Sequence, residues 1–336
     1  MRSLKVVQAV RSDTFAGVER YVSEVAAALS SLGHEVVVVG GDPAAMRAAM
    51  PPAVEHRAAE TTAQVAGELA RCGRPDIVHA HMSAAELAAV ATRPVHRAPV
   101  VATRHFASRR GGSPLSRAVM RTVARGLALE ISISNFVADA SGPGSVVLYN
   151  GVRDQPEGHD RERTVLIMQR LEPEKDTATA VRAFAASGLQ EQGWRLQVAG
   201  RGSQRDEVCA LAAKLGVTVE LLGFVSDPQS LLASAGLLVA PAPAEPFGLT
   251  VVEAMATGLP VVASRGGAHV ETVAADGLLF PPYDVEACAA ALRRLAGDLP
   301  GRVRAGAGLR LRQQGLFSLS YHVAVLVVEY GARAGR

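Results

Sequence analysis

This chain of 336 residues has few cysteines, a small net charge and no long apolar run. Its three cysteines lie far apart with no C-x-x-C spacing, so the sequence predicts neither a disulfide framework nor a zinc site. Lys and Arg number 35 against 32 Asp and Glu, a surplus too small to indicate nucleic-acid binding. No apolar run reaches the roughly 18 residues of a membrane-spanning helix, and no signal-peptide pattern opens the chain. We therefore expect a cytoplasmic protein that does not bind nucleic acid.

Apolar residues, by contrast, make up 49% of the chain and recur as short runs between helix-like segments. Such alternation is typical of a parallel β-sheet covered by helices on both faces. The strand-like runs cover residues 4–10, 35–39, 76–80, 99–103, 129–133 and 145–149 in the first half, and residues 165–169, 195–199, 217–222, 237–240, 261–264 and 278–280 in the second.

The two series of strand-like runs are joined by a polar segment. Residues 153–163 are charged and are interrupted by Pro156 and Gly158, as is usual in a linker. The prediction is an α/β fold of two doubly wound Rossmann-like domains that face a cleft. The first domain would cover residues 1–151 and the second residues 152–317.

Two glutamates, Glu245 and Glu253, lie on either side of a predicted helix start in the second domain. The segment from one apolar run, 236–240, to the next, 260–264, has the pattern strand, loop, helix, strand. Ligands of open parallel sheets bind at the carboxyl ends of strands, where the N–H groups of a helix start point outward. The alternative is that Thr250 and Glu253 form a capping box, and the spacing by itself favours that interpretation.

A second candidate loop has the sequence R-L-E-P-E-K and follows the first strand of the second domain. It places two cations, Arg170 and Lys175, at the carboxyl end of that strand. A diphosphate leaving group needs such cations, because its charge grows as the bond to it breaks. Alternatively the loop is simply solvated, and a surface pair of Glu174 and Lys175 contributes little.

The whole string E-P-F-G-L-T-V-V-E-A-M-A-T-G-L-P-V-V-A, residues 245–263, resembles the E-x7-E signature of family-4 retaining glycosyltransferases of the two-Rossmann-domain (GT-B) type. The R-L-E-P-E-K loop is similar to that family's G-R-L-x-P-E-K loop, with Gln169 in place of the glycine. The resemblance covers most of the chain and is densest over residues 170–284. It implies transfer of a sugar from a nucleoside diphosphate sugar to an acceptor hydroxyl, with the anomeric configuration retained. It also implies no metal and no other cofactor, in agreement with the lack of a D-x-D motif.

The same resemblance implies partners and roles. The first domain would bind the acceptor, which would be a glycan, a lipid-linked molecule or a small molecule, and the second domain would bind the nucleotide sugar. The helix-like segment at residues 318–336 would pack back on the first domain. In the second domain, Arg170 and Lys175 would hold the donor diphosphate. Glu245 would bind the transferred sugar, and Glu253 would bind the ribose. The backbone amides of Phe247, Gly248 and Leu249 would donate hydrogen bonds near the sugar and phosphate, and backbone groups at Gly223 would contact the base.

In the first domain, residues 15–20 look like the family's glycine-rich first loop, with Gly17 present and Ala16 in the other glycine position. Gly17 would contact the donor, unless it only forms a helix-start turn. The string T-R-H-F resembles the place where the family presents a histidine to the donor sugar, and this assigns His105 to donor binding. His79 and His81 lie two residues apart, but no carboxylate or cysteine occurs at ligand spacing, so we expect loop-orienting hydrogen bonds there and no metal.

Residues 104–125 contain the one concentrated charge on the chain, with six arginines and no acidic residue. Residues 113–126 are predicted to form a helix. We expect its arginine stripe to meet an anionic membrane, at the inner face, or a phosphate-bearing acceptor, and a merely solvated face is the alternative. The six arginines are Arg104, Arg109, Arg110, Arg117, Arg121 and Arg125. The last three would form the arginine stripe of the helix. An apolar stripe that packs on the domain would be formed by Leu115, Val119, Val123 and Leu127.

Two other functions remain open at this point. A glycosidase would use Glu245 and Glu253 as its two carboxylates, although hydrolysis would not require Arg170 and Lys175. A binding protein without catalytic activity would hold a nucleotide sugar and transfer nothing. The departures from the family pattern at Ala16 and Gln169 keep this second alternative open.

Overall fold

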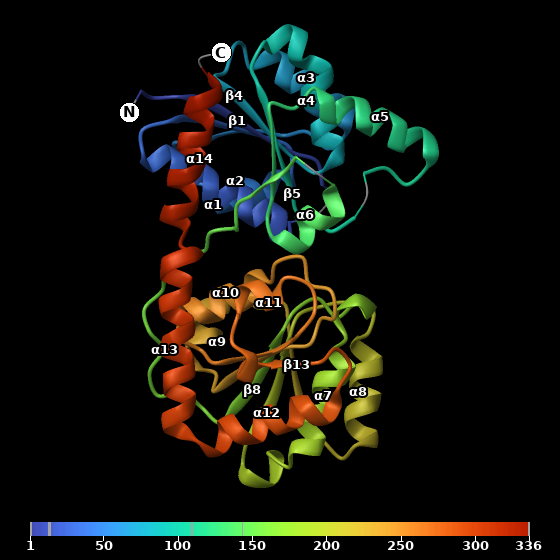
Figure 1. Ribbon diagram of the computed structural model, residues 1–336, viewed down its shortest axis with the longest axis vertical. Coiled ribbons are helices and arrows are strands. Elements are labelled where there is room, and N and C mark those ends of the chain that lie inside the picture. Colours follow the sequence, from blue (N-terminus) through green and yellow to red (C-terminus); the bar gives the residue numbers. More distant parts are fainter. Residues whose placement is uncertain (1, 13–14, 109, 143, 335–336) are drawn as a thin grey trace. The chain divides into compact units, whose positions relative to one another are not determined.

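The structure is a computed structural model that describes residues 2–12, 15–108, 110–142 and 144–334. The chain divides into two compact units (Figure 1). Unit 1 runs from the amino terminus to Gly151 and also includes helix α14 (Leu319–Ala334). Unit 2 is Val152–Ser318.

Unit 1 is built on a seven-stranded sheet in the order β3-β2-β1-β4-β5-β6-β7, in which all paired strands are parallel. The order reverses between β1 and β4, and in doubly wound sheets ligands bind at the carboxyl ends next to such a reversal. The strands are β1 (Lys5–Val10), β2 (Glu35–Val39), β3 (Glu55–Arg57), β4 (Ile77–His81), β5 (Val100–Arg104), β6 (Leu129–Ser132) and β7 (Val146–Val147).

Helices cover both faces of this sheet, because successive residues of a strand point to opposite faces. In β2, Val36 and Val38 pack in the core beneath α1 and α14, whereas Val37 and Val39 pack in the core beneath α3 and α4. Helix α14 lies beside α1 in Figure 1. The helices are α1 (Gly17–Ser31), α2 (Pro43–Ala49), α3 (Thr62–Arg71), α4 (Ser83–His96), α5 (Pro114–Arg125), α6 (Asn135–Ser141) and α14.

Unit 2 repeats the plan with a six-stranded parallel sheet in the order β10-β9-β8-β11-β12-β13, which reverses between β8 and β11. The strands are β8 (Thr164–Met168), β9 (Arg195–Ala199), β10 (Val219–Gly223), β11 (Leu237–Ala240), β12 (Val261–Ser264) and β13 (Leu279–Phe280). The helices are η1 (Pro173–Lys175), α7 (Thr177–Ser187), η2 (Gln190–Gln192), α8 (Arg205–Lys214), α9 (Pro228–Ser234), α10 (Leu249–Ala256), α11 (His269–Thr272), η3 (Asp276–Leu278), α12 (Val285–Gly297) and α13 (Leu299–Leu316).

The α/β prediction with two doubly wound parallel sheets is confirmed, and each predicted strand-like run forms a strand. Strand β3 is absent from the sequence prediction. Its three residues, Glu-His-Arg, include no apolar side chain, and the strand exists because it pairs with β2 at the sheet edge. Its neighbour α2 is a helix of seven residues, too short to show a clear apolar period.

Candidate functional site

In unit 2 the carboxyl ends of the neighbouring strands β8 and β11 bring together Lys175 and Glu245. The Lys175 Nζ lies 2.6 Å from Glu245 Oε2, and the two side chains are only 18% and 15% exposed. Both loops leave the same edge of the sheet, because β8 and β11 are parallel and adjacent. The two residues are 70 positions apart in the chain and were assigned to separate motifs. The structure joins these motifs through a largely buried ion pair at the strand-order reversal.

Arg170, at the other end of the β8 loop, is in a different environment. Its Nη2 lies 2.6 Å from Glu174 Oε1, and the two side chains are 60% and 58% exposed, so this pair contributes little to stability. Gln169, which replaces the family's glycine, donates from Nε2 to the Lys175 carbonyl and to Thr177 Oγ1, both at 3.0 Å. Gln169 therefore connects the beginning of the loop with its end at Lys175, whereas the Arg170 side chain is exposed.

The capping-box interpretation of Thr250 and Glu253 is wrong. Helix α10 begins at Leu249, and its N-cap is Gly248 in a left-handed conformation with φ 88° and no side-chain cap. Thr250 and Glu253 therefore lie inside the helix, and Glu253 is buried. Phe247 is also buried, with its ring 5.9 Å from that of Phe317, so only its backbone can serve a ligand. The first amides of α10 have no acceptor within the helix, which supplies hydrogen-bond donors next to Glu245.

Three residues that the sequence analysis missed support the Glu245 loop. A Cβ on Gly266 would lie 2.0 Å from the Pro243 carbonyl oxygen, and one on Gly267 would lie 2.3 Å from the Glu245 carbonyl oxygen. The ring of buried His269 lies against Gly248, where a Cβ would be 3.2 Å from the His269 Cδ2. Burial lowers the pKa of His269, and neighbouring Glu245 acts in the opposite sense. The signal in the sequence was the glycine pair one residue after a buried strand.

Gly223 lies at the carboxyl end of β10, with φ 63°. Its carbonyl accepts a hydrogen bond from the Gly200 amide at 2.7 Å, which connects it with the turn after β9. Phe224 is exposed, and the Arg201 guanidinium lies 5.6 Å from the centre of its ring. These groups lie at the same sheet edge as the Lys175 pair, because β8, β9 and β10 are parallel.

In unit 1, His105 lies at the carboxyl end of β5 and is buried. Its Nε2 is 3.1 Å from His81 Nδ1, and its ring lies 5.2 Å from that of Tyr21 on α1. Burial lowers the pKa of His105 to about 3. Gly17 is the first residue of α1, and the Ala16 amide donates to Glu19 Oε2 at 2.8 Å. His105 thus packs against the helix that Gly17 begins.

His79 and His81 are buried and form hydrogen bonds inside unit 1. His79 contacts the Tyr330 hydroxyl at 2.5 Å and Thr103 Oγ1 at 2.7 Å, and His81 contacts Gln8 Oε1 at 2.7 Å. Among the described residues, no group of three histidine, cysteine, aspartate or glutamate side chains could hold a metal ion.

The helix expected at residues 113–126 is α5, but its packing face differs from the expected one. Met120 and Val123 are buried, whereas Leu115 is 77% and Val119 43% exposed. The prediction that Leu115 and Val119 pack on the domain is therefore wrong. A stripe of period four drifts around a helix of period 3.6, and the buried face is centred on Met120 and Val123 instead.

The other arginines of this segment are partly used internally. Arg110 pairs with Glu86 at 2.6 Å and with Glu130 at 3.0 Å, and Arg104 donates to the Ser108 carbonyl. Arg109 lies outside the described residues. The concentrated charge seen in the sequence is therefore reduced to the arginines of α5, of which Arg121 and Arg125 are exposed and Arg117 is half-buried. In the part of the chain that the structure describes, no helix is long and apolar enough to cross a membrane.

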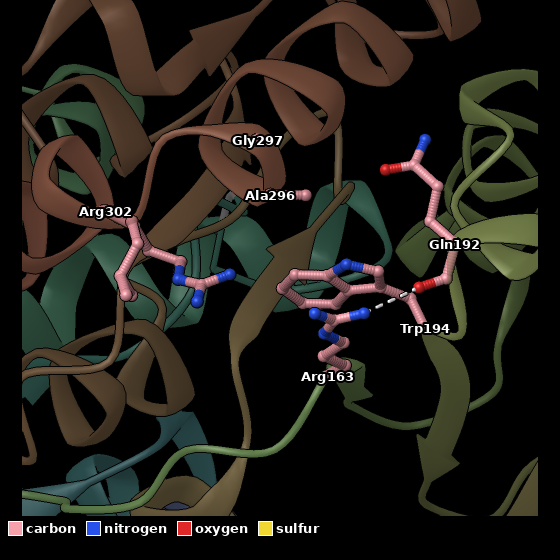
Figure 2. Close-up of a pocket in the computed structure, with 7 residues that line it drawn as sticks. Arg163, Gln192, Trp194, Ala296, Gly297 and Arg302 are labelled. Atoms are coloured by element: carbon pink, nitrogen blue, oxygen red, sulfur yellow. Dashed lines mark hydrogen bonds between the residues drawn. The ribbon is translucent and has the colours of Figure 1, made fainter.

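A cavity of about 220 Å³ lies elsewhere in unit 2, at the amino ends of β8 and β9. Figure 2 shows Arg163, which donates to the Gln192 carbonyl at 3.1 Å, and Arg302, whose guanidinium lies 5.0 Å from the centre of the Trp194 ring. The strand direction places this cavity at the sheet edge opposite the Lys175 and Glu245 pair, so it has no part in that site.

Comparison with known proteins agrees with this architecture. Residues 152–308 match the family model described as glycosyl transferases group 1, and residues 15–155 match that of glycosyltransferase family 4. The chain is 29% identical over 375 aligned positions to the glycogen synthase of Mycobacterium tuberculosis, covering 93% of this chain and 90% of that one. It is 29% identical over 330 positions to the phosphatidyl-myo-inositol mannosyltransferase of Mycolicibacterium smegmatis, covering 88% and 84%.

A match to the exopolysaccharide phosphotransferase of Streptomyces coelicolor is 39% identical but covers 40% of this chain and only 15% of that protein. Among solved structures, Anabaena HepE in complex with UDP superposes with a TM-score of 0.84, at 21% identity and with 98% and 100% of the two chains covered. The sucrose-phosphate synthase of Thermosynechococcus elongatus gives 0.79, at 18% identity and with 98% of each chain covered. The fold and the matches define a glycosyltransferase of the GT-B type. The chain belongs to the family-4 glycosyltransferases.

Proposed function

We propose that this glycosyltransferase moves a sugar from a nucleoside diphosphate sugar to an acceptor hydroxyl, with retention of configuration and without a metal ion. The observation that carries the proposal is the Lys175 and Glu245 ion pair beside the amino end of α10. The structural neighbour Anabaena HepE has been solved with UDP and with UDP-glucose, which supports a nucleotide-sugar donor here.

In this proposal the cations act on the leaving group. Lys175 is already held at the sheet edge by Glu245, and it gives its remaining hydrogen bonds to the diphosphate. Arg170 is exposed, and its pair with Glu174 is weak enough to be exchanged for a phosphate. Both charges matter most as the bond to the diphosphate breaks, because negative charge then accumulates there.

The two glutamates act on hydroxyl groups. Glu245 accepts hydrogen bonds from the transferred sugar while it orients Lys175, and Glu253 accepts them from the ribose. The acceptor attacks on the face from which the diphosphate leaves, and a phosphate oxygen takes the acceptor's proton, so no protein nucleophile is needed. A glycosidase mechanism has less support, because its acid must carry a proton whereas Glu245 is ion-paired with an ammonium group.

The test is turnover of Lys175→Ala and Arg170→Ala with a panel of nucleotide sugars, followed by released nucleotide. We expect each to lower turnover by at least about 100-fold, equivalent to roughly 2.7 kcal/mol of transition-state stabilisation. Lys214→Ala and Arg205→Ala, at exposed positions on α8, are the matched controls and should keep parent activity. Parent-like turnover in both site variants, with melting temperatures unchanged, would overturn the assignment.

We also propose that the outer surface of α5 lies on an anionic membrane, where it reaches a lipid-linked acceptor. Leu115 and Val119 are exposed on one flank of the helix, and Arg121 and Arg125 are exposed on the other. An interfacial helix has this character, since apolar side chains enter the headgroup region and each nearby cation adds on the order of 1 kcal/mol. The exposed leucine and valine favour a membrane over a soluble phosphate-bearing acceptor.

Binding to phosphatidylcholine vesicles should rise with their share of phosphatidylserine and fall with salt. Two variants should each weaken it: Leu115→Ser with Val119→Ser, and the triple change of Arg117, Arg121 and Arg125 to glutamine. Leu311→Ser, at an exposed leucine of α13, is the control for the apolar change. If both variants bind such vesicles as the parent does, α5 is only a solvated face.

A further inference from the structure

Two arginines and a tryptophan from three separate elements line the cavity of about 220 Å³ in unit 2 (Figure 2). Arg163 comes directly before β8, Trp194 comes directly before β9, and Arg302 lies in the first turn of α13. Because β8 and β9 pair in parallel, the residues that precede them lie next to each other. The Arg302 guanidinium lies 5.0 Å from the centre of the Trp194 ring. The cavity therefore combines hydrogen-bond donors that are far apart in the chain.

Several of these donors have no partner in the fold. Arg302 Nη1 is buried and meets no hydrogen-bond acceptor among the described residues. Trp194 is only 5% exposed, and in the same part of the chain its indole N–H has no acceptor either. Arg163 donates to the Gln192 carbonyl at 3.1 Å and keeps its other N–H groups. Buried donors of this kind usually have a partner, so a ligand with acceptor oxygens would satisfy them.

The cavity also carries positive charge that no carboxylate neutralises. Neither Arg163 nor Arg302 forms an ion pair with a residue that the structure describes. Burial lowers the pKa of Arg302, and the charge of Arg163 acts in the same direction. The carboxylates next to them in the chain are used elsewhere: Glu162 pairs with a different arginine, and Asp298 caps α13. An anion between the two guanidinium groups would relieve their repulsion.

The size and chemistry of the cavity limit the class of ligand. Sites for drug-sized molecules enclose about 300–1,000 Å³. A cavity of 220 Å³ is too small for a whole nucleotide sugar, so it is no second donor site. Guanidinium groups bind phosphate with two parallel hydrogen bonds, and two of them match the charge of a phosphate dianion better than that of a carboxylate. A phosphate ion is much smaller than this volume, which leaves room for a small group attached to it.

We propose that this cavity binds a small phosphate-bearing molecule, in which Arg163 and Arg302 hold the phosphate oxygens and the Trp194 N–H donates one further hydrogen bond. The ligand connects the beginning of β8 with the amino end of α13, since the two arginines come from these elements. Bound ligand therefore makes unit 2 more resistant to unfolding. The inference is independent of the proposed function, because the cavity lies at the sheet edge opposite the Lys175 and Glu245 pair.

Trp194 is the one tryptophan of the sequence, so its fluorescence reports on the cavity directly. The whole chain is titrated with inorganic phosphate, glucose 6-phosphate, glucose and acetate at constant ionic strength, and calorimetry measures the same affinities. Both phosphates should change the emission until it saturates, because they bind Arg302 beside the ring. Glucose should change nothing.

The relative affinities identify the source of the phosphate group. Glucose 6-phosphate that binds at least about tenfold more tightly than inorganic phosphate indicates a phosphate ester. Equal affinities indicate free phosphate. Acetate that binds as tightly as either phosphate would overturn the choice of phosphate, and no saturable change in fluorescence or heat with either phosphate would overturn the site.

Variants test the two arginines. Arg163→Gln and Arg302→Gln should each weaken phosphate binding at least about tenfold, as expected for the loss of a charge-assisted hydrogen bond. Arg302→Lys keeps the charge without the planar fork and should bind with intermediate affinity. Arg304→Gln, at an exposed arginine of the same helix, is the matched control and should bind as the parent does. Parent affinity in both glutamine variants, with unchanged melting temperatures, would refute the inference.

The donor site of the proposed function also binds phosphate groups, so the two sites have to be separated. Lys175→Ala should lower turnover but keep the Trp194 response to phosphate, and excess UDP should leave that response in place. A response that is lost in Lys175→Ala, or that UDP displaces, would show that phosphate acts from the donor site and would overturn the inference. A response that persists while Lys175→Ala turns over as the parent does would count against the proposed function and support this second site.

Discussion

Unit 1 should lose stability steeply as the pH falls from 7 to 5, because four neutral histidines, His79, His81, His105 and His322, are buried in it. The unfolded chain binds a proton on each near pH 6.5, whereas burial lowers the pKa of His105 to about 3, that of His322 to about 4, and those of His79 and His81 well below the ordinary value. Between these values the unfolded state holds more protons than the folded state. The free energy of unfolding therefore decreases as the pH decreases.

The size of the effect follows from the number of groups. Each histidine that stays neutral in the fold costs about 1.4 kcal/mol per pH unit below 6.5, or about 2 kcal/mol at pH 5. Four of them give roughly 8 kcal/mol, which is comparable to the whole stability of a typical domain. Burial lowers the pKa values of His34 and His96 as well, and both add to the loss.

Urea unfolding at a series of pH values tests this, because the chain provides its own control. Trp194 is the one tryptophan of the sequence and lies in unit 2, so its fluorescence reports that unit, whereas far-UV circular dichroism reports both. In unit 2, His269 is buried and its pKa is lowered by burial, so a much shallower pH dependence is expected there. His105→Gln should remove roughly a fifth of the unit 1 slope, since six histidines contribute to it, and His159→Gln, at an exposed position, should remove none. Equal pH dependence of the two transitions would refute the reasoning.

Three further outcomes are expected. Gly200→Ala should lower the free energy of unfolding by several kcal/mol in urea titrations, since the new Cβ would lie 1.8 Å from the Gln169 carbonyl oxygen. Gly216→Ala, where a Cβ has open space, should cost only about 1 kcal/mol. Similar losses in the two variants would contradict this prediction. Glu253→Gln should raise the donor's Michaelis constant with little change in melting temperature, and parent kinetics would count against ribose binding. Turnover should persist in excess chelator, and a loss that magnesium restores would show that a metal neutralises the diphosphate.

The sequence predicted the parts of the fold that depend on local patterns. Buried parallel strands read as short apolar runs, so their number and order along the chain were accessible. Strand β3 was not, because its residues are polar and only its pairing with β2 makes it a strand. The buried face of α5 was predicted wrongly for a related reason. Equal apolar spacing does not reveal which turns of a short helix pack on a neighbour, and Leu115 lies on a turn where it is 77% exposed.

In the candidate site, too, residues in local motifs could be predicted, whereas contacts that depend on the fold could not. Arg170, Lys175, Glu245 and Glu253 could be proposed from the sequence because each stands in a motif with a recognisable spacing. The ion pair between Lys175 and Glu245 was not predicted, since it depends on the strand order of the sheet and not on any spacing along the chain. The hydrogen bonds that connect Gln8, His79, His81, His105 and Tyr330 were equally inaccessible, because these residues lie far apart along the chain.

Helix α14 follows all of unit 2 in the chain and yet belongs to the core of unit 1. During synthesis, β1 to β7 leave the ribosome first, and they must wait for residues 152–318 before Tyr330 and His322 are made. At about 5–20 residues per second, that interval is roughly ten to thirty seconds. For that time Gln8 and His79 lack their tyrosine partner, and the apolar face that α14 later covers stays exposed. Unit 2 is thus free to fold while unit 1 is incomplete, and a nascent chain paused in this interval is the form most exposed to aggregation and most in need of a chaperone.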